Sequence, residues 1–271
     1  MRVPETRPPP RAGVRQSARG AFSAVVAGAL VSSMVALAQP AGAGAGAFAP
    51  PSGCESFATI QNRACSVSVL WRCEVAPEGD FWEASFSDEG LESVVSYDRE
   101  YQWLDAAYFW DSSREEFTPP AVDPISRDDL LSTGIDTFDF TMRRVTPDRR
   151  YEIRVVGADM LTGATATIDG YTLDEVKTRL EIIDDDGAVE YASQGIQYYS
   201  RDLGLFFLGA EEVFGPDGEI STWDDRPTDI ILPGEPGFGD TQPLYGCNLQ
   251  DAALTPAAPF PAQKEMNDDQ L

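Results

Sequence analysis

The feature of this sequence that most constrains its fold is a repeated alternation of apolar and polar residues over short runs. Residues 138–143 and residues 151–155 both alternate in this way. Neighbouring side chains of a strand point to opposite faces, so a period of two predicts half-buried antiparallel strands. Residues 66–75 and 81–87 show the same period. Residues 175–183 fit both helical and strand spacing, and we predict a strand there because the neighbouring segments are strands.

One segment carries helix signals instead. Ser126 and Asp129 stand at the spacing of a capping box, and Gly134 is placed to end a helix. The run Asp184-Asp185-Asp186-Gly187 predicts a hairpin turn, and the proline-rich and glycine-rich residues 224–245 predict a loop. The sequence therefore predicts a mainly β fold, a single antiparallel sheet domain that is half-barrel or sandwich-like, with one or two short helices.

The cysteines restrict the fold further. Cys54, Cys65, Cys73 and Cys247 form an even set, which in an exported chain predicts two disulfides. If residues 66–75 form a strand, Cys65 and Cys73 stand about 26 Å apart, whereas bonded cysteines have Cα atoms roughly 4.4–6.8 Å apart. Two pairings remain: Cys54–Cys65 with Cys73–Cys247, or Cys54–Cys73 with Cys65–Cys247. We favour the first, because it closes a short N-terminal loop and ties a core-facing cysteine to the end of the domain.

The first residues predict export from the cytoplasm. Five arginines between positions 2 and 19 precede an uncharged stretch, residues 21–38, as in the basic and apolar regions of a signal peptide. Ala45-Gly46-Ala47 and Ala36-Leu37-Ala38 each match a signal peptidase site, and we favour cleavage after Ala47 over cleavage after Ala38. The alternative is an uncleaved signal anchor, although this stretch barely reaches the roughly 20 apolar residues that a bilayer core requires.

These boundaries divide the chain into four parts. We predict a signal peptide over residues 1–47, a linker over 48–53, a β-rich domain over 54–247 and a disordered tail over 248–271. The predicted location is periplasmic or secreted. No integral membrane segment is expected after cleavage.

The chain beyond residue 47 is strongly acidic. It keeps 15 basic against 44 acidic residues, a net charge of −29, and the whole sequence has no histidine. Such a surface repels nucleic acid, so we expect no nucleic-acid partner. Without histidine there is no Ser-His-Asp triad, no Cys-His pair and no histidine zinc site. We therefore predict no catalytic, metal-binding or cofactor-binding residues, and we expect that the chain is not an enzyme.

Aromatic residues supply the candidate ligand site. Trp71, Trp82, Tyr198 and Phe206 are candidates to line a groove on a concave sheet, and such grooves bind apolar ligands. The alternative is that these residues fill an ordinary β core, as aromatic residues commonly do. The same set includes Trp103, Trp110, Tyr199 and Phe207.

Short motifs between residues 121 and 214 resemble those of a known family. They are Asp123-Pro124-Ile125-Ser126 with Leu130-Leu131, then Val155-Val156-Gly157 and Thr162-Gly163-Ala164, then residues 197–205. Their order resembles a family of uncharacterised periplasmic proteins of Gram-negative bacteria. That family is similar to the open half-barrels of the lipoprotein-carrier type, in which a curved antiparallel sheet wraps a helix and holds an acyl chain. The resemblance implies this fold and no particular functional residue.

Three functions follow from these observations. The first, which we favour, is an exported, non-enzymatic envelope protein that binds an apolar or lipid-like ligand on a concave β-sheet. The second is a structural or protein-interaction module, whose partner is another envelope protein. The third is a carboxylate-based hydrolase, which requires two carboxyl groups of raised pKa in one cleft.

Overall fold

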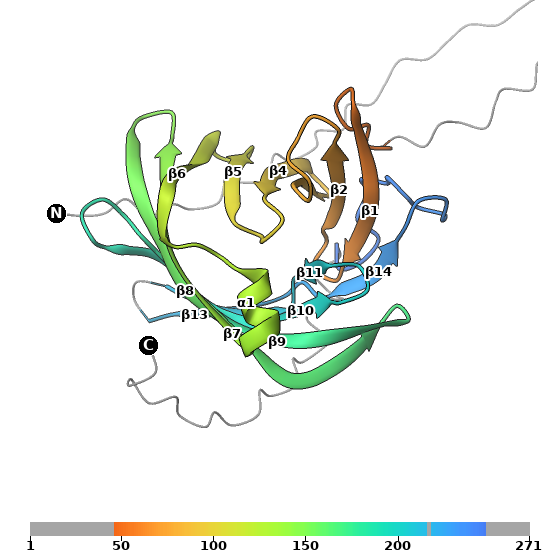
Figure 1. The fold of residues 1–271 in the computed structure, drawn as a ribbon. Helices are drawn as coiled ribbons and strands as arrows, with labels where there is room; N and C mark the ends of the chain where they lie inside the picture. Colours follow the sequence, from red (N-terminus) through yellow and green to blue (C-terminus); the bar gives the residue numbers. More distant parts are fainter. Residues whose placement is uncertain (1–45, 216–217, 248–271) are drawn as a thin grey trace, which may run out of the picture. The chain divides into compact units, whose positions relative to one another are not determined.

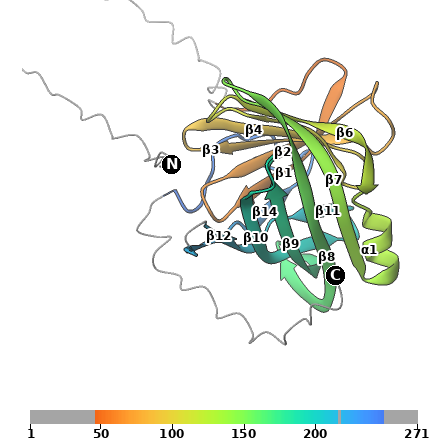
Figure 2. The same ribbon diagram turned by 90° about the vertical axis from the view of Figure 1, so that its left-hand side faces the viewer.

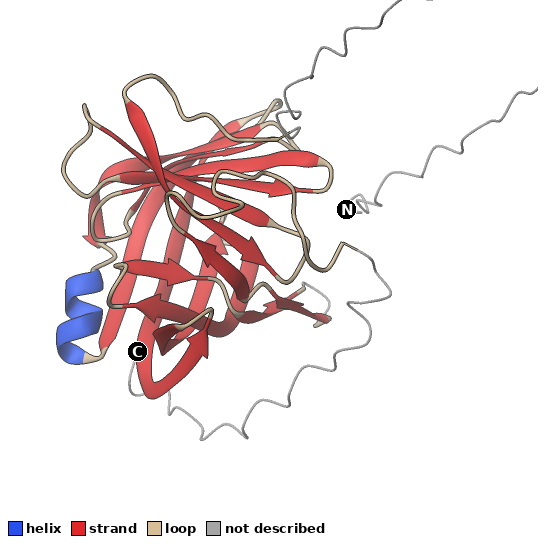
Figure 3. Cartoon of the chain, turned by 90° about the vertical axis from the view of Figure 1, so that its right-hand side faces the viewer, coloured by secondary structure: helices blue, strands red, loops and turns tan. Residues whose placement is uncertain are grey.

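The computed structural model describes residues 46–215 and 218–247. The tail and all but the last two residues of the predicted signal peptide lie outside these ranges. The described residues form fourteen strands and one helix, which confirms the predicted mainly β class (Figure 3). The helix in these ranges does not have the length and hydropathy of a membrane-spanning segment.

The elements follow one another along the chain through mostly short connections. The first part contains β1 (Cys54–Asn62), β2 (Val67–Cys73), β3 (Phe81–Ser87), β4 (Gly90–Tyr97), β5 (Trp103–Tyr108), β6 (Ser113–Asp123) and α1 (Arg127–Thr133). The second part contains β7 (Ile135–Val145), β8 (Arg150–Ile168), β9 (Tyr171–Ile183), β10 (Val189–Ser200), β11 (Leu205–Phe207), β12 (Ala210–Phe214), β13 (Ile220–Asp224) and β14 (Pro227–Ile231).

All of these strands join one antiparallel sheet. From β1 to β10, each strand pairs with the next along the chain. Beyond β10 the pattern changes, because β11 and β12 both pair with β10 and β13 pairs with β12. The last strand, β14, crosses to the other side of the sheet and pairs with β1. The sheet is therefore open, with β13 and β14 as its edges within the described residues.

The sheet curls strongly, because a very short connection links its two edges. β13 ends at Asp224 and β14 begins at Pro227, and an extended chain of that length spans at most about 11 Å. Side chains of β1–β3 accordingly meet those of β9–β11 in one core cluster, which includes Leu70, Phe81 and Leu173. Figure 1 shows the sheet curving around this interior.

The predicted alternation is confirmed in β7 and β8. Phe140 and Met142 on β7 are buried opposite Val155 and Ile153 on β8, and each is at most 1% exposed. These residues form a core cluster on the concave face of the sheet. The ambiguous residues 175–183 belong to β9, so the strand prediction is confirmed there as well.

The helix forms where its capping signals predict it. The Ser126 side chain accepts a hydrogen bond from the Asp129 amide at 3.1 Å, and Gly134 ends the helix with a φ of 90° that favours glycine. Leu130 is buried against Val176 and Tyr199. The helix also contacts β7 and β8, at one end of the sheet (Figure 2).

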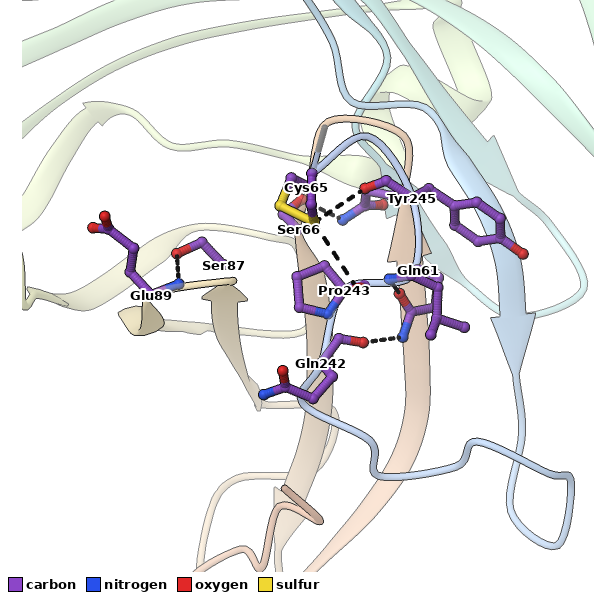
Figure 4. Close-up of a disulfide and its surroundings, with 11 residues drawn as sticks. Gln61, Cys65, Ser66, Ser87, Glu89, Gln242, Pro243 and Tyr245 are labelled. Atoms are coloured by element: carbon purple, nitrogen blue, oxygen red, sulfur yellow. Dashed lines mark hydrogen bonds between the residues drawn. A yellow bond between two sulfur atoms is a disulfide. The ribbon is translucent and has the colours of Figure 1, made fainter. Parts of the chain in front are cut away.

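Two flanking segments cover the outer face of β1–β3. Phe48, in the predicted linker, packs against Trp71 with ring centroids 4.9 Å apart. The buried side chain of Gln61 donates a hydrogen bond to the Gln242 carbonyl and accepts one from the Leu244 amide (Figure 4). The segment that follows β14 is thereby held on the outer side of β1.

Two disulfides join the four cysteines, which is typical of an oxidising, exported environment. The bonds are Cys54–Cys73 and Cys65–Cys247, so our favoured pairing is wrong and the alternative is correct. Cys54 begins a strand that we did not predict, and it is the register partner of Cys73 on β2. Cys65 lies in the β1–β2 turn, which the segment after β14 reaches (Figure 4).

Residues 224–245 contain a strand where we predicted only a loop. Ile230 and Ile231 of β14 pair with Ile60 and Thr59 of β1. Pro227 stands at the first position of this edge strand, where a missing amide is tolerated. Its pairing partner, β1, lies far upstream in the sequence, so no hairpin turn next to the strand predicts it.

Candidate functional site

A cavity of about 200 Å³ lies on the concave side of the sheet. Residues of β1–β5 line one side, and residues of β7–β12 line the other. Arg127 and Leu130 of α1 contribute to the lining as well. Both halves of the curled sheet and the helix therefore contribute to the cavity wall.

Aromatic rings form much of the cavity wall. Phe81, Tyr97 and Tyr101 pack against one another with ring centroids between 5.0 and 5.8 Å apart. The Tyr101 hydroxyl donates a hydrogen bond to the Gly204 carbonyl and accepts one from the Phe206 amide, each at 3.0 Å. These two bonds tie the β4–β5 connection to the β10–β11 hairpin, so they join the two sides of the cavity.

Polar residues cross one wall of the cavity along the register of neighbouring strands. Asp136 on β7 pairs with Asp159 on β8, which pairs with Thr178 on β9. Thr178 pairs with Gly195 on β10, which in turn pairs with Glu211 on β12. Register partners point to the same face of a sheet. We call Asp136, Asp159, Thr178 and Glu211 the polar row, and all four line the cavity.

Apolar residues flank the polar row on both sides. Toward α1, Leu161 pairs with Val176, which packs against Leu130. In the other direction, Phe138 pairs with Gly157, where an added Cβ would lie 2.4 Å from the Phe138 ring. The glycine thus leaves room for the ring. The polar row is therefore a strip of polar groups between packed apolar side chains.

The carboxyl group of Asp159 lacks a hydrogen-bond partner for one of its two oxygens. Its Oδ1 atom is buried and has no hydrogen-bond partner among the described residues. Burial raises the pKa of Asp159 to about 6, although a hydrogen bond with Thr178 acts to lower it. Burial also raises the pKa of Asp136 to about 7, and the charge of Asp159 adds to this rise. The Asp136 carboxylate accepts a hydrogen bond from the Ser126 amide at 3.0 Å, so it also fixes the start of α1.

The remaining charged groups face the polar row from other elements. Glu83 on β3 lines the opposite wall, and burial raises its pKa. Arg127 lies 3.7 Å from Glu100 and 3.3 Å from Asp128, and its Nε atom is buried with no hydrogen-bond partner in the described part of the chain. Among the described residues, four carboxyl groups and one guanidinium line the cavity, those of Glu83, Asp136, Asp159, Glu211 and Arg127.

Replacing Asp159 with asparagine is expected to stabilise the fold at pH 8 by about 3 kcal/mol, because a pKa raised from 3.8 to about 6 corresponds to that energy. The folded-state pKa lies above the unfolded value. The stability that the neutral carboxyl contributes is therefore complete below pH 3.8 and is lost as the pH rises through 6. Urea unfolding at pH 8 and at pH 3.5 measures the difference. If Asp159→Asn raises the free energy of unfolding equally at both pH values, this explanation is contradicted.

The structure separates the aromatic residues that we proposed from the sequence. Trp71 and Trp82 stack on the outer face of β2 and β3, with ring centroids 6.5 Å apart, and do not line the cavity. Tyr198 is buried in the core cluster shared by β1–β3 and β9–β11. Phe206 does line the cavity. Of the wider set, Trp103 and Phe207 line it too, Tyr199 packs against α1, and Trp110 is exposed.

Sequence reasoning missed the polar row, although a signal for it exists. Asp136 lies two residues before Phe138 on the same strand, so it points to the same inner face as Phe138 and Phe140. Asp159 lies four residues after Val155, so it shares the inner face with that residue. An acid at an inward position of a buried strand is rare and marks a candidate functional group. The alternation alone does not reveal that these acids belong to neighbouring strands in register.

The cavity therefore offers aromatic faces and carboxyl groups to a ligand. Within residues 46–215 and 218–247, no group of three or more His, Cys, Asp or Glu side chains is arranged to hold a metal ion. Comparisons of the chain with protein-family models, curated proteins and solved structures gave no match.

Proposed function

We propose that this chain is an exported, non-enzymatic envelope protein that binds a small apolar ligand in the cavity of its concave sheet. The observation that carries the proposal is a cavity of about 200 Å³ whose lining combines aromatic and aliphatic side chains with carboxyl and other polar groups. Concave, mostly apolar spaces with few polar groups are typical of ligand sites. The curled open sheet with one helix also supports a carrier of the type that the sequence resembles.

The size of the cavity limits the ligand. An apolar cavity of about 150 Å³ binds benzene, whereas pockets for drug-sized ligands measure roughly 300–1,000 Å³. A cavity of about 200 Å³ therefore accommodates a single ring or a short chain, but not a long acyl chain. The ligand that we propose is a small molecule, or the small end of a larger one.

Filling the cavity is expected to abolish the binding of a small neutral probe. Leu180 lines the cavity, and a tryptophan at this position would occupy part of its volume. Arg179 is the exposed neighbour on the same strand, so Arg179→Trp is a matched control. Saturation-transfer NMR should detect benzyl alcohol on the unmodified protein and on Arg179→Trp, and not on Leu180→Trp. If both variants bind the probe equally, the cavity is not the site and the proposal fails.

We also propose that export uses a cleaved signal and that the mature chain begins before Gly46. The Gly46 carbonyl accepts a hydrogen bond from the Thr241 amide at 2.9 Å, and Ala47 forms a bridge with Asp240. Cleavage after Ala47, which the sequence favours, would remove these contacts, so we expect cleavage after Ala38. The intact mass of protein purified from the periplasm or the medium locates the N-terminus, and a chain that lacks Ala47 would contradict this expectation.

Carboxylate-based hydrolysis is a second candidate, because Asp136 and Asp159 are two acids of raised pKa in one cavity. Glycosidases place their two carboxyl groups on either side of the scissile bond, roughly 5 to 9.5 Å apart. Here the two acids are register partners on one wall, which favours binding over hydrolysis. If the protein hydrolyses nitrophenyl glycosides and Asp159→Asn abolishes this activity, hydrolysis rather than binding would be the better-supported function.

A further inference from the structure

The polar row identifies the chemical class of the ligand, provided that the cavity binds one as proposed above. We propose that the ligand is a small aromatic or aliphatic amine whose ammonium group binds at Asp159 in the polar row. Three features of the cavity carry this inference: an unpartnered carboxylate oxygen, the charge of the lining and the aromatic wall.

The first feature is the Oδ1 atom of Asp159. This oxygen is buried, belongs to a residue that lines the cavity, and accepts no hydrogen bond from any described residue. Buried carboxylate oxygens are normally hydrogen-bonded, because an unpaired one is costly in free energy. Because Asp159 lines the cavity, rotation of its carboxylate would turn this oxygen toward the cavity, where an ammonium group would supply the missing donor. A carboxylate or phosphate group would not, because it has no proton to donate when ionised.

The second feature is the charge of the groups that face the polar row. Arg127 is the cation among the described lining residues, and Glu100 and Asp128 already lie next to it. Glu83 on β3 faces the row, and Asp136 and Glu211 belong to it. The charges of Asp123 and Asp129 act on Asp136 as well. A cleft lined mainly by charge of one sign attracts ligands of the opposite sign.

The third feature is the aromatic wall. Phe81, Tyr97, Tyr101 and Phe138 line the same cavity as the polar row. The face of an aromatic ring carries partial negative charge and attracts ammonium groups. The rings therefore favour both the apolar body of an amine and its charged end.

The proposal implies that binding weakens in acid. Burial raises the pKa values of Asp136 and Asp159 to about 7 and about 6, so both are largely protonated at pH 5. A simple alkylamine stays positively charged over this range. A neutral carboxylic acid attracts an ammonium group far less than a carboxylate does. The affinity for an amine should therefore fall as the pH drops from 8 to 5, whereas the affinity for a neutral ligand of the same shape should change little.

Isothermal titration with benzylamine and with the neutral benzyl alcohol tests the proposal. At pH 8 we expect benzylamine to bind at least about tenfold more tightly than benzyl alcohol, as for a charge-assisted hydrogen bond. The preference should disappear at pH 5 and in Asp159→Asn. Asp139→Asn should keep it, because Asp139 lies on the outward side of β7 and pairs with Arg154.

The two probes distinguish a failure of amine selectivity from a failure of ligand binding as such. If benzyl alcohol binds as tightly as benzylamine at pH 8, or if Asp159→Asn keeps the preference, the cavity binds small apolar molecules without selecting amines. If neither probe binds, the proposed binding function fails as well. The pH dependence of the unmodified protein gives an independent test that needs no variant.

Discussion

Replacing Cys65 and Cys247 together with serine is expected to lower the free energy of unfolding by about 5 kcal/mol. This disulfide joins positions 182 residues apart, so it closes nearly the whole domain into one loop. In the chain-entropy model, a cross-link removes more freedom from the unfolded chain when the loop is longer. Equilibrium unfolding in urea under oxidising conditions measures the loss.

The second disulfide provides the control. Cys54 and Cys73 are 19 residues apart, and the same model assigns about 3 kcal/mol to a loop of this length. The Cys54→Ser/Cys73→Ser variant should therefore lose less stability than the Cys65→Ser/Cys247→Ser variant. The reverse order would show that loop entropy does not dominate, and that the contacts around the β1–β2 strand ends matter more.

Replacing Arg144 with methionine is expected to cost about 3–5 kcal/mol of stability, because it leaves a buried charge unpaired. Glu115 is 2% exposed, and its Oε1 atom lies 2.6 Å from Arg144 Nη2. The other oxygen of Glu115 accepts a hydrogen bond from the Tyr108 hydroxyl at 3.3 Å. Arg144 also pairs with Glu190. Thermal and urea unfolding at pH 7 measure the loss.

The adjacent residue gives a matched control. Arg143 pairs with Glu116 on the opposite face of the sheet, where both side chains are partly exposed. Exposed ion pairs contribute about 0–1 kcal/mol, so Arg143→Met should have little effect. The double variant Arg144→Met/Glu115→Leu should regain much of the loss, because it leaves no buried charge alone. A double variant as unstable as Arg144→Met would contradict this explanation.

Glu115 and Asp159, two acids of the interior, have different consequences for the stability of the fold. Glu115 is paired with Arg144, so its charge is compensated within the described structure. Asp159 has a raised pKa and an unpartnered oxygen, so its ionised form destabilises the fold. A packed core would be more stable with an apolar residue at this position. Binding of a cationic ligand is the physical role that we propose for this arrangement.

The sequence by itself determined the features that depend on near neighbours. The alternation in β7 and β8 specifies which side chains are buried, because adjacent residues of a strand must point to opposite faces. The helix starts at Ser126 and ends at Gly134 because both capping signals act within a few residues. The turn at Asp184 and Gly187 forms for the same reason, with Gly187 at a φ of 87°.

Only the tertiary structure decided the features that join distant segments. The disulfide pairing follows from the pairing of β1 with β2, and β14 exists because β1 offers it an edge. Asp136, Asp159 and Glu211 form one row because five strands share a register, and the curl of the sheet places Glu83 across from them. Strand register depends on all the contacts of a face at once. Local patterns therefore predict which residues point inward, and long-range pairing decides which of them meet.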